Sequence, residues 1–563
     1  MINIAAIPPG LILVFGGLLL PFLRGNIRNA VLLGLPLIVL YFIWQVPDGV
    51  SVTVPYLGYD LILVKGDNLS RLFATVFALM SATGAVFAFN QQKTSELAAA
   101  FVYAGSAISV TFCGDLISLF IFWEIMAVAS TVVVMSGGEN SLQTGIRYAA
   151  IHFLGGVLLM AGIAGEIASN GGNIAFVSMS AELTVPRLLI LAGFLINAGA
   201  PPFSSWLSDA YPAASWSGTV FLSAFTTKTA VYVLMRGFPG TELLIYVGLY
   251  MVFYGIVYAI LENDMRRILA YSIINQVGFM VTAIGIGSEM ALNGAAAHAF
   301  AHIIYKALLL MSAGSVLYMT GKSKCTDLGG LFRTMPLTCI CGTIGAFAIS
   351  AFPWTSGFVT KSMISQGAAD AHLATVWFLL MAASAGVFLH AGIKFPWFVF
   401  FQKDSGLRPS EPPLNMRVAM IFFAFLCIAI GLYPAPLYEI LPYPVKYVPY
   451  TGSHIVFQLQ LLLFSGLAFF LMLGLLKRTL TITLDFDWFY RKFGLLLARE
   501  FHILSGQAWR GFVDRTLKIV SRGIARLYDI HGPSGVFAKS WPTGSMAFWT
   551  TLMLGAYLLL YYI

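Results

Sequence analysis

Apolar runs of about 20 residues recur along almost the whole chain, and each is long enough to cross the hydrocarbon core of a bilayer. The chain is 59% hydrophobic and only 10% charged, whereas a soluble protein carries about 25% charged residues. A membrane β-barrel would show short alternating segments instead of long apolar runs. The sequence therefore predicts an all-α polytopic membrane protein with about 14–16 transmembrane helices.

The apolar runs also set the expected limits of the spans. The first nine residues lack the basic segment of a secretory signal peptide, so we expect the first span to be retained. The runs lie near 9–23, 29–46, 70–90, 97–113, 116–135, 146–167, 186–202, 215–236, 242–261, 267–286, 293–320, 336–365, 373–401, 416–434, 455–476 and 546–563.

Basic residues gather in alternate loops. With the N-terminus outside, one face collects Arg24, Arg28, Lys93, Arg266, Arg267, Lys322, Lys324, Arg333, Lys403, Arg408, Lys477 and Arg478. The opposite loops, near 114, 168–185 and 287–292, have almost no Lys or Arg. The positive-inside rule makes the basic face cytoplasmic. The net charge of +8 is thereby explained without nucleic acid.

Two of the spans contain helix-breaking sequences. Gly199-Ala-Pro-Pro-Phe-Ser-Ser-Trp interrupts the seventh span, and Phe352-Pro-Trp-Thr-Ser-Gly-Phe interrupts the twelfth, with Pro353 lying 151 residues after Pro202. Proline removes a backbone donor and clashes with the preceding turn. A simple proline kink would explain each break alone. Paired breaks at corresponding places in two halves are typical of inverted-repeat transporters.

Charged side chains lie inside several spans, where each costs several kcal/mol and is by default a functional candidate. The residues we assign to proton translocation are Glu124, Lys228, His298, His302, Lys306, Lys361 and Lys394. Possible auxiliary residues are Arg147, His152, His390 and Asn197. A single His is often a packing residue, and Arg147 or Lys394 can extend to an interface. Charges of both signs spread over many spans are harder to explain by packing.

The five cysteines do not form a recognisable redox or metal motif. They are scattered, and none are spaced as CxxC, so neither a disulfide framework nor a metal cluster is expected. We predict no metal, no cofactor and no covalent chemistry. The C-terminal region differs in kind, because from about 495 to 530 apolar residues recur at helical spacing opposite a basic face. This pattern predicts an amphipathic helix lying along a surface, followed by the last span.

The motifs around the buried charges resemble those of the antiporter-like membrane subunits shared by Mrp-type Na⁺/H⁺ antiporters, respiratory complex I and membrane-bound hydrogenases. The segment over roughly 67–400 is most similar to the D-type subunits of Mrp antiporters. The residues that carry the resemblance are Phe122-Trp-Glu-Ile-Met, Trp206-Leu-Ser-Asp-Ala-Tyr-Pro, Thr227-Lys-Thr-Ala-Val-Tyr, Asn263-Asp-Met-Arg-Arg-Ile-Leu-Ala-Tyr-Ser, His298-Ala-Phe-Ala-His-Ile-Ile-Tyr-Lys-Ala-Leu, Leu328-Gly-Gly-Leu-Phe-Arg-Thr-Met-Pro and Ser356-Gly-Phe-Val-Thr-Lys.

The resemblance implies two inverted five-helix repeats with a polar axis across the membrane centre. Glu124 matches the family's fifth-span glutamate, and Lys228 its eighth-span lysine. The central His/Lys connection matches His298, His302 and Lys306, and Lys361 matches the lysine of the second broken helix. Two features depart from the family. Asn197, nine residues before Trp206, stands where the family has a lysine. The extended tail is more similar to the largest antiporter-like subunit of complex I.

The expected regions are N-terminal helices over 1–96, a first repeat over 97–236, a second repeat over 242–401, peripheral helices over 416–476, and a lateral helix with a final span over 477–563. We predict a proton-translocating subunit of a multisubunit Na⁺/H⁺ antiporter in the cell inner (plasma) membrane, with other membrane subunits, H⁺, Na⁺ and lipid as partners. Alternatives are a subunit of a redox-driven pump or, because of Asn197, a largely structural subunit. A module coupled to inorganic-carbon uptake is a further alternative.

Overall fold

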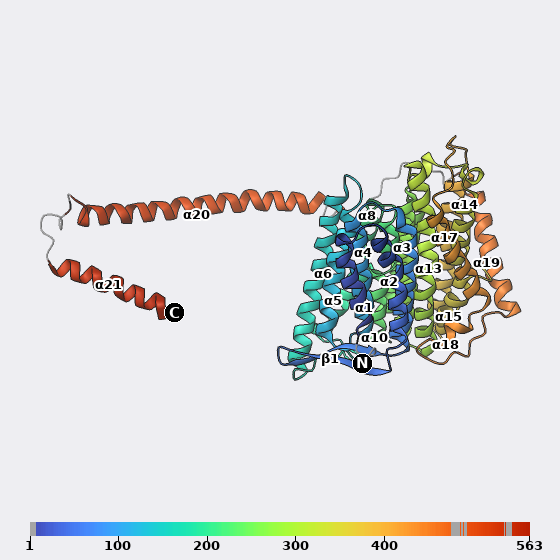
Figure 1. The fold of residues 1–563 in the computed structure, drawn as a ribbon, viewed down its shortest axis with the longest axis horizontal. Helices are drawn as coiled ribbons and strands as arrows, with labels where there is room; N and C mark the ends of the chain where they lie inside the picture. Colours follow the sequence, from blue (N-terminus) through green and yellow to red (C-terminus); the bar gives the residue numbers. More distant parts are fainter. Residues whose placement is uncertain are drawn as a thin grey trace. The chain divides into compact units, whose positions relative to one another are not determined.

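The computed structural model divides into two compact units. The structure describes residues 7–474, 485, 488, 492–533, 535 and 543–562, with the side chain of residue 495 left out. The first unit is Met1–Phe486 and the second is Asp487–Ile563. Helices dominate both units, as predicted. Figure 1 shows the helices of the first unit side by side across one slab.

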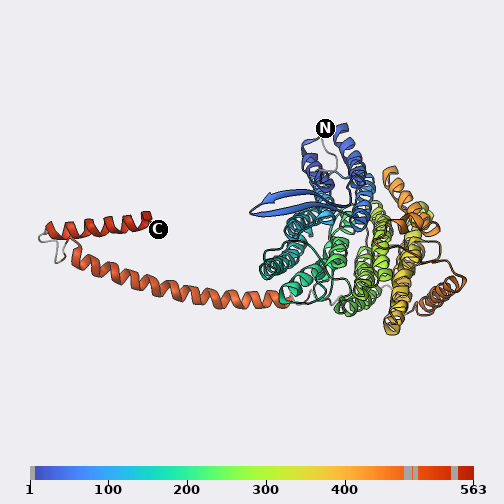
Figure 2. The ribbon, with the colours of Figure 1, turned by 90° about the horizontal axis from the view of Figure 1, so that it is seen from below.

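Within the described ranges, 13 helices are long and apolar enough to cross a membrane. Shorter apolar helices occur at Pro9–Phe22, Val185–Ala198 and Pro336–Ile349. These observations confirm the polytopic membrane fold. In the rotated view, the blue N-terminal helices lie at the top of the bundle, the teal ones at the lower left, and the yellow and orange ones on the right (Figure 2).

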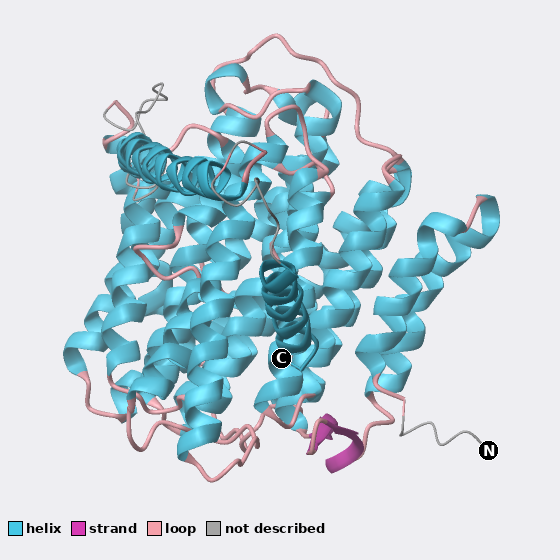
Figure 3. Ribbon diagram, turned by 90° about the vertical axis from the view of Figure 1, so that its left-hand side faces the viewer, coloured by secondary structure: helices cyan, strands magenta, loops and turns pink. Residues whose placement is uncertain are grey.

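The N-terminal region comprises three apolar helices and a hairpin. It contains α1 (Pro9–Leu19), η2 (Leu20–Phe22), α2 (Gly25–Ile43), β1 (Gly49–Tyr56), β2 (Tyr59–Gly66), α3 (Asn68–Phe87) and η3 (Ala88–Asn90). The antiparallel hairpin, magenta at the foot of the bundle in Figure 3, is an addition to the predicted all-helical chain. Leu57 and Gly58 both have positive φ at its turn.

Two sets of helices follow in the same order of long and broken members. The first is α4 (Thr94–Phe112), α5 (Leu116–Met135), α6 (Ser141–Ser169), α7 (Val185–Ala198), α8 (Ser205–Ala213), α9 (Gly218–Leu222) and α10 (Thr226–Gly237). The second is α11 (Leu243–Leu261), α12 (Met265–Ile286), α13 (Glu289–Thr320), η4 (Cys325–Asp327), η5 (Leu331–Arg333), α14 (Pro336–Ile349), α15 (Ser356–Asp370), α16 (Ala374–Val387) and the π-helical η6 (Phe388–Lys394) and η7 (Trp397–Phe401).

The peripheral part of the first unit contains α17 (Leu414–Leu432), α18 (Ala435–Glu439) and α19 (Gly452–Leu471). Helix α17 packs against α3, α13, α14 and α15. The N-terminal helices and this peripheral helix are thereby held together around α13, the longest helix of the first unit and one that is almost entirely buried.

Both predicted helix breaks are present. Helix α7 ends at Ala198, and Gly199 caps it with a φ of 81°. A side chain at Gly199 would meet Leu207 and adopt an unfavourable backbone conformation, so glycine suits this position. At the second break, Ala351 and Trp354 have positive φ. Because α7 and α14 each have 14 residues, or about 21 Å of helix, neither crosses the bilayer alone.

The eighth span contains a third interruption, which the sequence analysis did not anticipate. Helix α9 ends at Leu222 and α10 begins at Thr226. The carbonyl of Leu222 accepts a hydrogen bond from Tyr211 at 2.6 Å, and the amide of Thr226 donates to the Tyr103 hydroxyl at 2.9 Å. These side chains satisfy backbone groups that the missing helical turn would otherwise leave unpaired in a dry interior.

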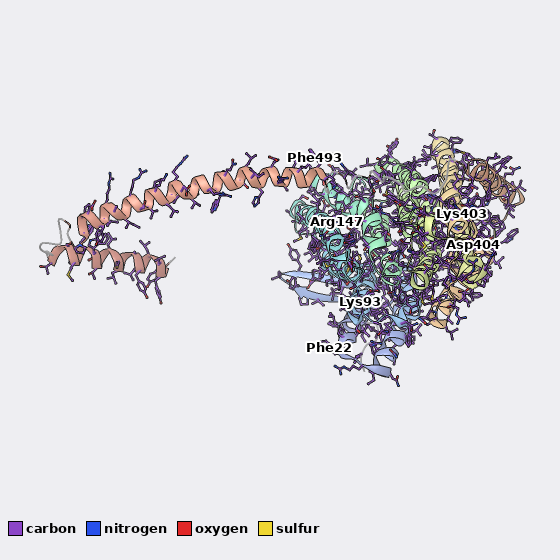
Figure 4. All side chains as sticks on the ribbon, turned by 90° about the horizontal axis from the view of Figure 1, so that it is seen from above. Phe22, Lys93, Arg147, Lys403, Asp404 and Phe493 are labelled. Carbon is purple, nitrogen blue, oxygen red and sulfur yellow. The ribbon has the colours of Figure 1, made fainter. Side chains whose placement is uncertain are left out.

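Contacts between loops agree with the predicted sides of the membrane. Arg28 donates to Thr94, and Lys93 donates to the carbonyl of Ser136. Arg333 pairs with Asp404 at 3.5 Å. Loops that the positive-inside rule places on one face are therefore neighbours in the fold. Figure 4 looks down on the bundle and labels Lys93, Arg147, Lys403 and Asp404.

The second unit contains α20 (Gly494–His531) and α21 (Thr543–Tyr562). Helix α20 has 38 residues and matches the predicted amphipathic helix over about 495–530. Its apolar stripe is exposed within this unit, since Leu517, Val520, Ile524 and Leu527 all have exposed side chains. The second unit thus presents a long apolar stripe that the rest of this unit does not cover.

Candidate ion-translocation pathway

Glu124 lies in the middle of α5 and packs against α6 at Gly156, which has no side chain. One of its carboxylate oxygens is buried without a hydrogen-bond partner. A Cβ added to Gly156 on α6 would lie 2.2 Å from Oε1 of Glu124 and 2.9 Å from its Cδ. The absence of a side chain at Gly156 therefore creates the space that the carboxylate occupies.

An aromatic cluster lies along α6 at the first broken helix. The His152 ring lies 4.1 Å from the Tyr148 ring and 4.6 Å from the Trp206 ring, measured between centroids. Trp206 on α8 also donates its indole N–H to the carbonyl of Ile196 on α7, at 3.0 Å. The indole thus bridges the two halves of the broken helix. Asn197, fully buried at the end of α7, follows this carbonyl directly.

Two cations of the first repeat, Arg147 and Lys228, are already engaged. Arg147 forms a two-pronged ion pair with Asp209 on α8, at 2.8 and 3.1 Å. Lys228 is fully buried, and its ammonium donates to the carbonyl of Ser223 at 2.6 Å and to the hydroxyl of Thr227 at 3.0 Å. Lys228 therefore sits at the third helix interruption, where the carbonyl of Ser223 accepts a hydrogen bond from its ammonium.

The predicted central residues His298, His302 and Lys306 lie on buried faces of α13, which packs against α12 and α15. His298 bonds to Gln276 at 3.0 Å and to Thr360 at 3.1 Å. The hydroxyl of Tyr305 lies 3.2 Å from Nε2 of His298, the nitrogen that also bonds to Gln276. Proton donors and acceptors are thus continuous from α12 to α15 through one imidazole, whose two nitrogens can take and release a proton.

His302 and Lys306 continue this line along α13. The His302 ring lies 6.3 Å from the His298 ring, and neither of its nitrogens has a hydrogen-bond partner. Lys306 is fully buried and donates to Ser272 on α12 at 2.6 Å. The spacing of four residues between His298, His302 and Lys306 predicted this shared face, and the structure places all three in the interior.

Lys361 stands at the inner wall of a cavity of about 540 Å³. It follows the second helix break on α15, and its ammonium lies 4.2 Å from the centre of the Phe279 ring without a hydrogen-bond partner. The polar lining includes Ser362, Ser365, Gln366, Ser384, Tyr447, Thr451, Ser453, His454 and Gln458. The ammonium of Lys361 thus lies between an aromatic ring, whose face attracts a cation, and a cavity with several polar side chains.

His390 and Lys394 lie on the π-helical segment η6. The ammonium of Lys394 donates to the carbonyls of Ala259, Ile260 and Glu262, at 3.1, 2.5 and 2.5 Å. It therefore caps the C-terminal end of α11, where a cation is stabilised by the helix dipole. His390 bonds to the carbonyl of Gly386 at 2.9 Å on its own helix.

A further buried carboxylate escaped the sequence analysis, because it lies in the first turn of its span. Glu96 on α4 is 1% exposed and accepts hydrogen bonds from Ser215 and Ser217, both at 2.6 Å, and from Gln91 at 3.2 Å. No spacing along the sequence links α4 to this loop between α8 and α9. The polar partners Gln276, Ser272 and Thr360 were also missed, because no spacing along the sequence shows which helices pack together.

The family described as "NADH:quinone oxidoreductase/Mrp antiporter, TM" matches residues 113–388. The chain is 29% identical over 411 residues to a probable K⁺/H⁺ antiporter A/B subunit of Rhizobium meliloti, and 29% over 401 residues to the D subunit of a Na⁺/H⁺ antiporter of Alkalihalophilus pseudofirmus. It is 25% identical over 426 residues to hydrogenase-4 component B of Escherichia coli. These matches cover 68%, 64% and 67% of this chain, and 41%, 80% and 63% of the relatives.

Solved structures share the fold. A chain of the Mrp complex from Dietzia sp. DQ12-45-1b superposes with a TM-score of 0.69 and 21% identity, over 78% of this chain and 96% of that one. A chain of the membrane-bound sulfane sulfur reductase, an archaeal respiratory membrane complex, superposes with a TM-score of 0.72 and 22% identity, over 99% of both chains. Over the matched residues, this chain is therefore similar to the membrane subunits of Mrp antiporters, NADH:quinone oxidoreductase and related complexes.

Proposed function

We propose that the chain is a proton-translocating subunit of a multisubunit cation/proton antiporter in the cell inner (plasma) membrane, with Na⁺ as the exchanged cation. The observation that carries the proposal is the line of buried titratable groups on α13 and α15, which bonds to polar side chains of α12. His298, Lys306 and Lys361 are each almost fully buried, where a charge without a function would be costly. The relatives named as antiporter subunits support the same reading.

In this proposal, protons pass by changes in pairing along the buried line. The His298 imidazole exchanges hydrogen bonds among Gln276, Thr360 and Tyr305. Lys306, bound to Ser272, holds or releases a proton on the same helix face. Lys361 passes the proton to water in its cavity. Glu124 and Lys228 would serve the first repeat, with His152 as an auxiliary group, because Asn197 cannot carry a proton charge.

The test is proton flux through the whole complex in sealed vesicles. Glu124→Gln and Lys361→Ala are each expected to reduce cation-coupled proton flux at least about tenfold, without preventing assembly. The exposed Lys403→Ala is the control and is expected to keep normal flux. Normal flux in both pathway variants would refute these assignments and favour a structural subunit.

A second candidate is a subunit of a redox-driven pump. The specific observation in its favour is the 99% coverage by a chain of the sulfane sulfur reductase complex, compared with 78% by a chain of the Mrp complex. Proteins that co-purify from native membranes distinguish the two candidates. Soluble partners with iron–sulfur or flavin groups would establish the redox-driven pump, and small membrane subunits without cofactors would establish the antiporter.

A further inference from the structure

A buried carboxylate outside the predicted pathway lies where the two repeats meet. Asp485 is only 5% exposed. It accepts a hydrogen bond from the Tyr271 hydroxyl at 2.6 Å, another from the Ser208 hydroxyl at 3.3 Å, and a third from the hydroxyl of Tyr254. These donors belong to α12, α8 and α11, so a single side chain connects the first broken helix to the first two helices of the second repeat.

The charged neighbours of this site form a network on the same elements. Arg267 on α12 donates to the carbonyl of Ser208 at 2.9 Å and lies 3.7 Å from the carboxylate of Glu262. Asp209, next to Ser208 on α8, pairs with Arg147 on α6. The titratable and charged groups around Asp485 are therefore Tyr254 and Tyr258 on α11, Tyr271 and Arg267 on α12, Asp209 on α8, Arg147 on α6, and Glu262 after α11.

The three hydrogen bonds let one carboxylate hold α8, α11 and α12 together. A buried carboxylate is costly unless hydrogen bonds replace its water, and bonds from hydroxyl groups to a charged acceptor are the strong kind. Helix α8 has only 9 residues and follows a break, so side-chain contacts must hold it. Asp485 supplies one of these contacts from a distant part of the chain.

The partners of Asp485 adjoin groups of the candidate pathway on both sides. Ser208 lies two residues after Trp206, whose ring packs against His152. Tyr271 directly precedes Ser272, which binds the ammonium of Lys306. A shift of α8 relative to α12 would therefore change the distance between the two halves of the buried line.

We propose that Asp485 is a positioning residue for ion translocation, which fixes α8 against α11 and α12. The proposal rests on the proposed transport function.

The first measurement does not depend on transport. In the whole purified complex, Ala210→Cys places a thiol on a buried position of α8, and the native cysteines in the described ranges are all buried. A water-soluble maleimide is expected to label this thiol at least about tenfold faster when Asp485→Asn is added, because local opening sets the labelling rate. Asp514→Asn, an exposed carboxylate on α20, is the matched control and is expected to leave the rate unchanged.

The second measurement is the pH profile of proton flux. Asp485→Asn is expected to shift this profile, because a displaced α8 changes the contact between Trp206 and His152, and Asp485→Glu is expected to restore it. An unchanged labelling rate would overturn the positioning role, and faster labelling with an unchanged pH profile would overturn its link to translocation. A complex with native Asp485 but no proton flux would refute the proposed function, while the labelling experiment would still decide whether Asp485 holds α8.

Discussion

The contact between Gly156 and Glu124 makes a sharp prediction, since one methyl group on α6 displaces the glutamate of α5. In Gly156→Ala the new Cβ would start 2.2 Å from Oε1 of Glu124, 2.9 Å from its Cδ and 3.2 Å from Oε2. An ordinary van der Waals contact needs about 3.4 Å. The carboxylate must therefore move by about 1 Å, and it can do so because it is the end of a flexible side chain.

The expected effect on transport is large, and the effect on stability is small. A misplacement of about 1 Å can reduce the rate of a positioned reaction by about 100-fold, so we expect flux to fall by about 10–100-fold. Replacing glycine by alanine inside a helix contributes up to about 1 kcal/mol of stability, which offsets part of the strain. The thermal unfolding temperature of the complex should consequently change little while flux falls.

The neighbouring glycine gives a matched control. A Cβ at Gly155 would lie 3.3 Å from Cγ2 of Ile196, a tight contact that a small movement of this side chain relieves, and at an ordinary 3.7 Å from the Asn197 amide oxygen. Proton flux of the assembled complex in vesicles is therefore expected to survive Gly155→Ala and to be lost in Gly156→Ala. Adding Glu124→Asp, one methylene shorter, should restore part of the flux. Full flux in Gly156→Ala would refute the claim that the placement of Glu124 matters.

Two further predictions concern groups at the ends of the bundle. The Arg408 guanidinium hydrogen-bonds to Asp404 and holds the pKa of that carboxyl below its usual value, so the contact is present above about pH 4 and is lost as the pH falls through the lower pKa of the folded state. Asp404→Asn should expose the 402–408 loop to protease at every pH, and unchanged cleavage would contradict this. Lys394→Met should lower the free energy of unfolding by about 2–4 kcal/mol, because three carbonyls lose a charged donor. Unchanged thermal unfolding with lost flux would instead place Lys394 in the pathway.

The sequence predicted the helices and two of the breaks because those signals are local. Long apolar runs identify spans, and glycine beside proline identifies the interruption after Ala198. The interruption between α9 and α10 has no glycine or proline at its centre. It depends on Tyr103 and Tyr211, which reach it from α4 and α8, so tertiary contacts determine it. The β1–β2 hairpin lies between the predicted spans 29–46 and 70–90, in a stretch for which no element was predicted.

The candidate site divides in the same way. The burial of Lys228, Lys306 and Lys361 followed from their position within apolar runs, and the structure confirms it. Their hydrogen-bond partners depend on how separate helices pack, and no pattern along one helix identifies them. Arg147 is the clearest example, because its position allowed it to extend to an interface, whereas it pairs with Asp209 on α8. Asp485 lies outside every predicted span in the sequence, so no local pattern identified it.

The two repeats differ in the titratable side chains along the candidate pathway. In the second, the groups from His298 to Lys361 include two imidazoles and two ammonium groups on adjoining helix faces. In the first, Asn197 is neutral, Arg147 is bound to a carboxylate, and Lys228 is bound to a carbonyl and a hydroxyl. Any proton step between Glu124 and Lys228 must then use His152 or water. In the proposed function, the second repeat therefore supplies the more complete path.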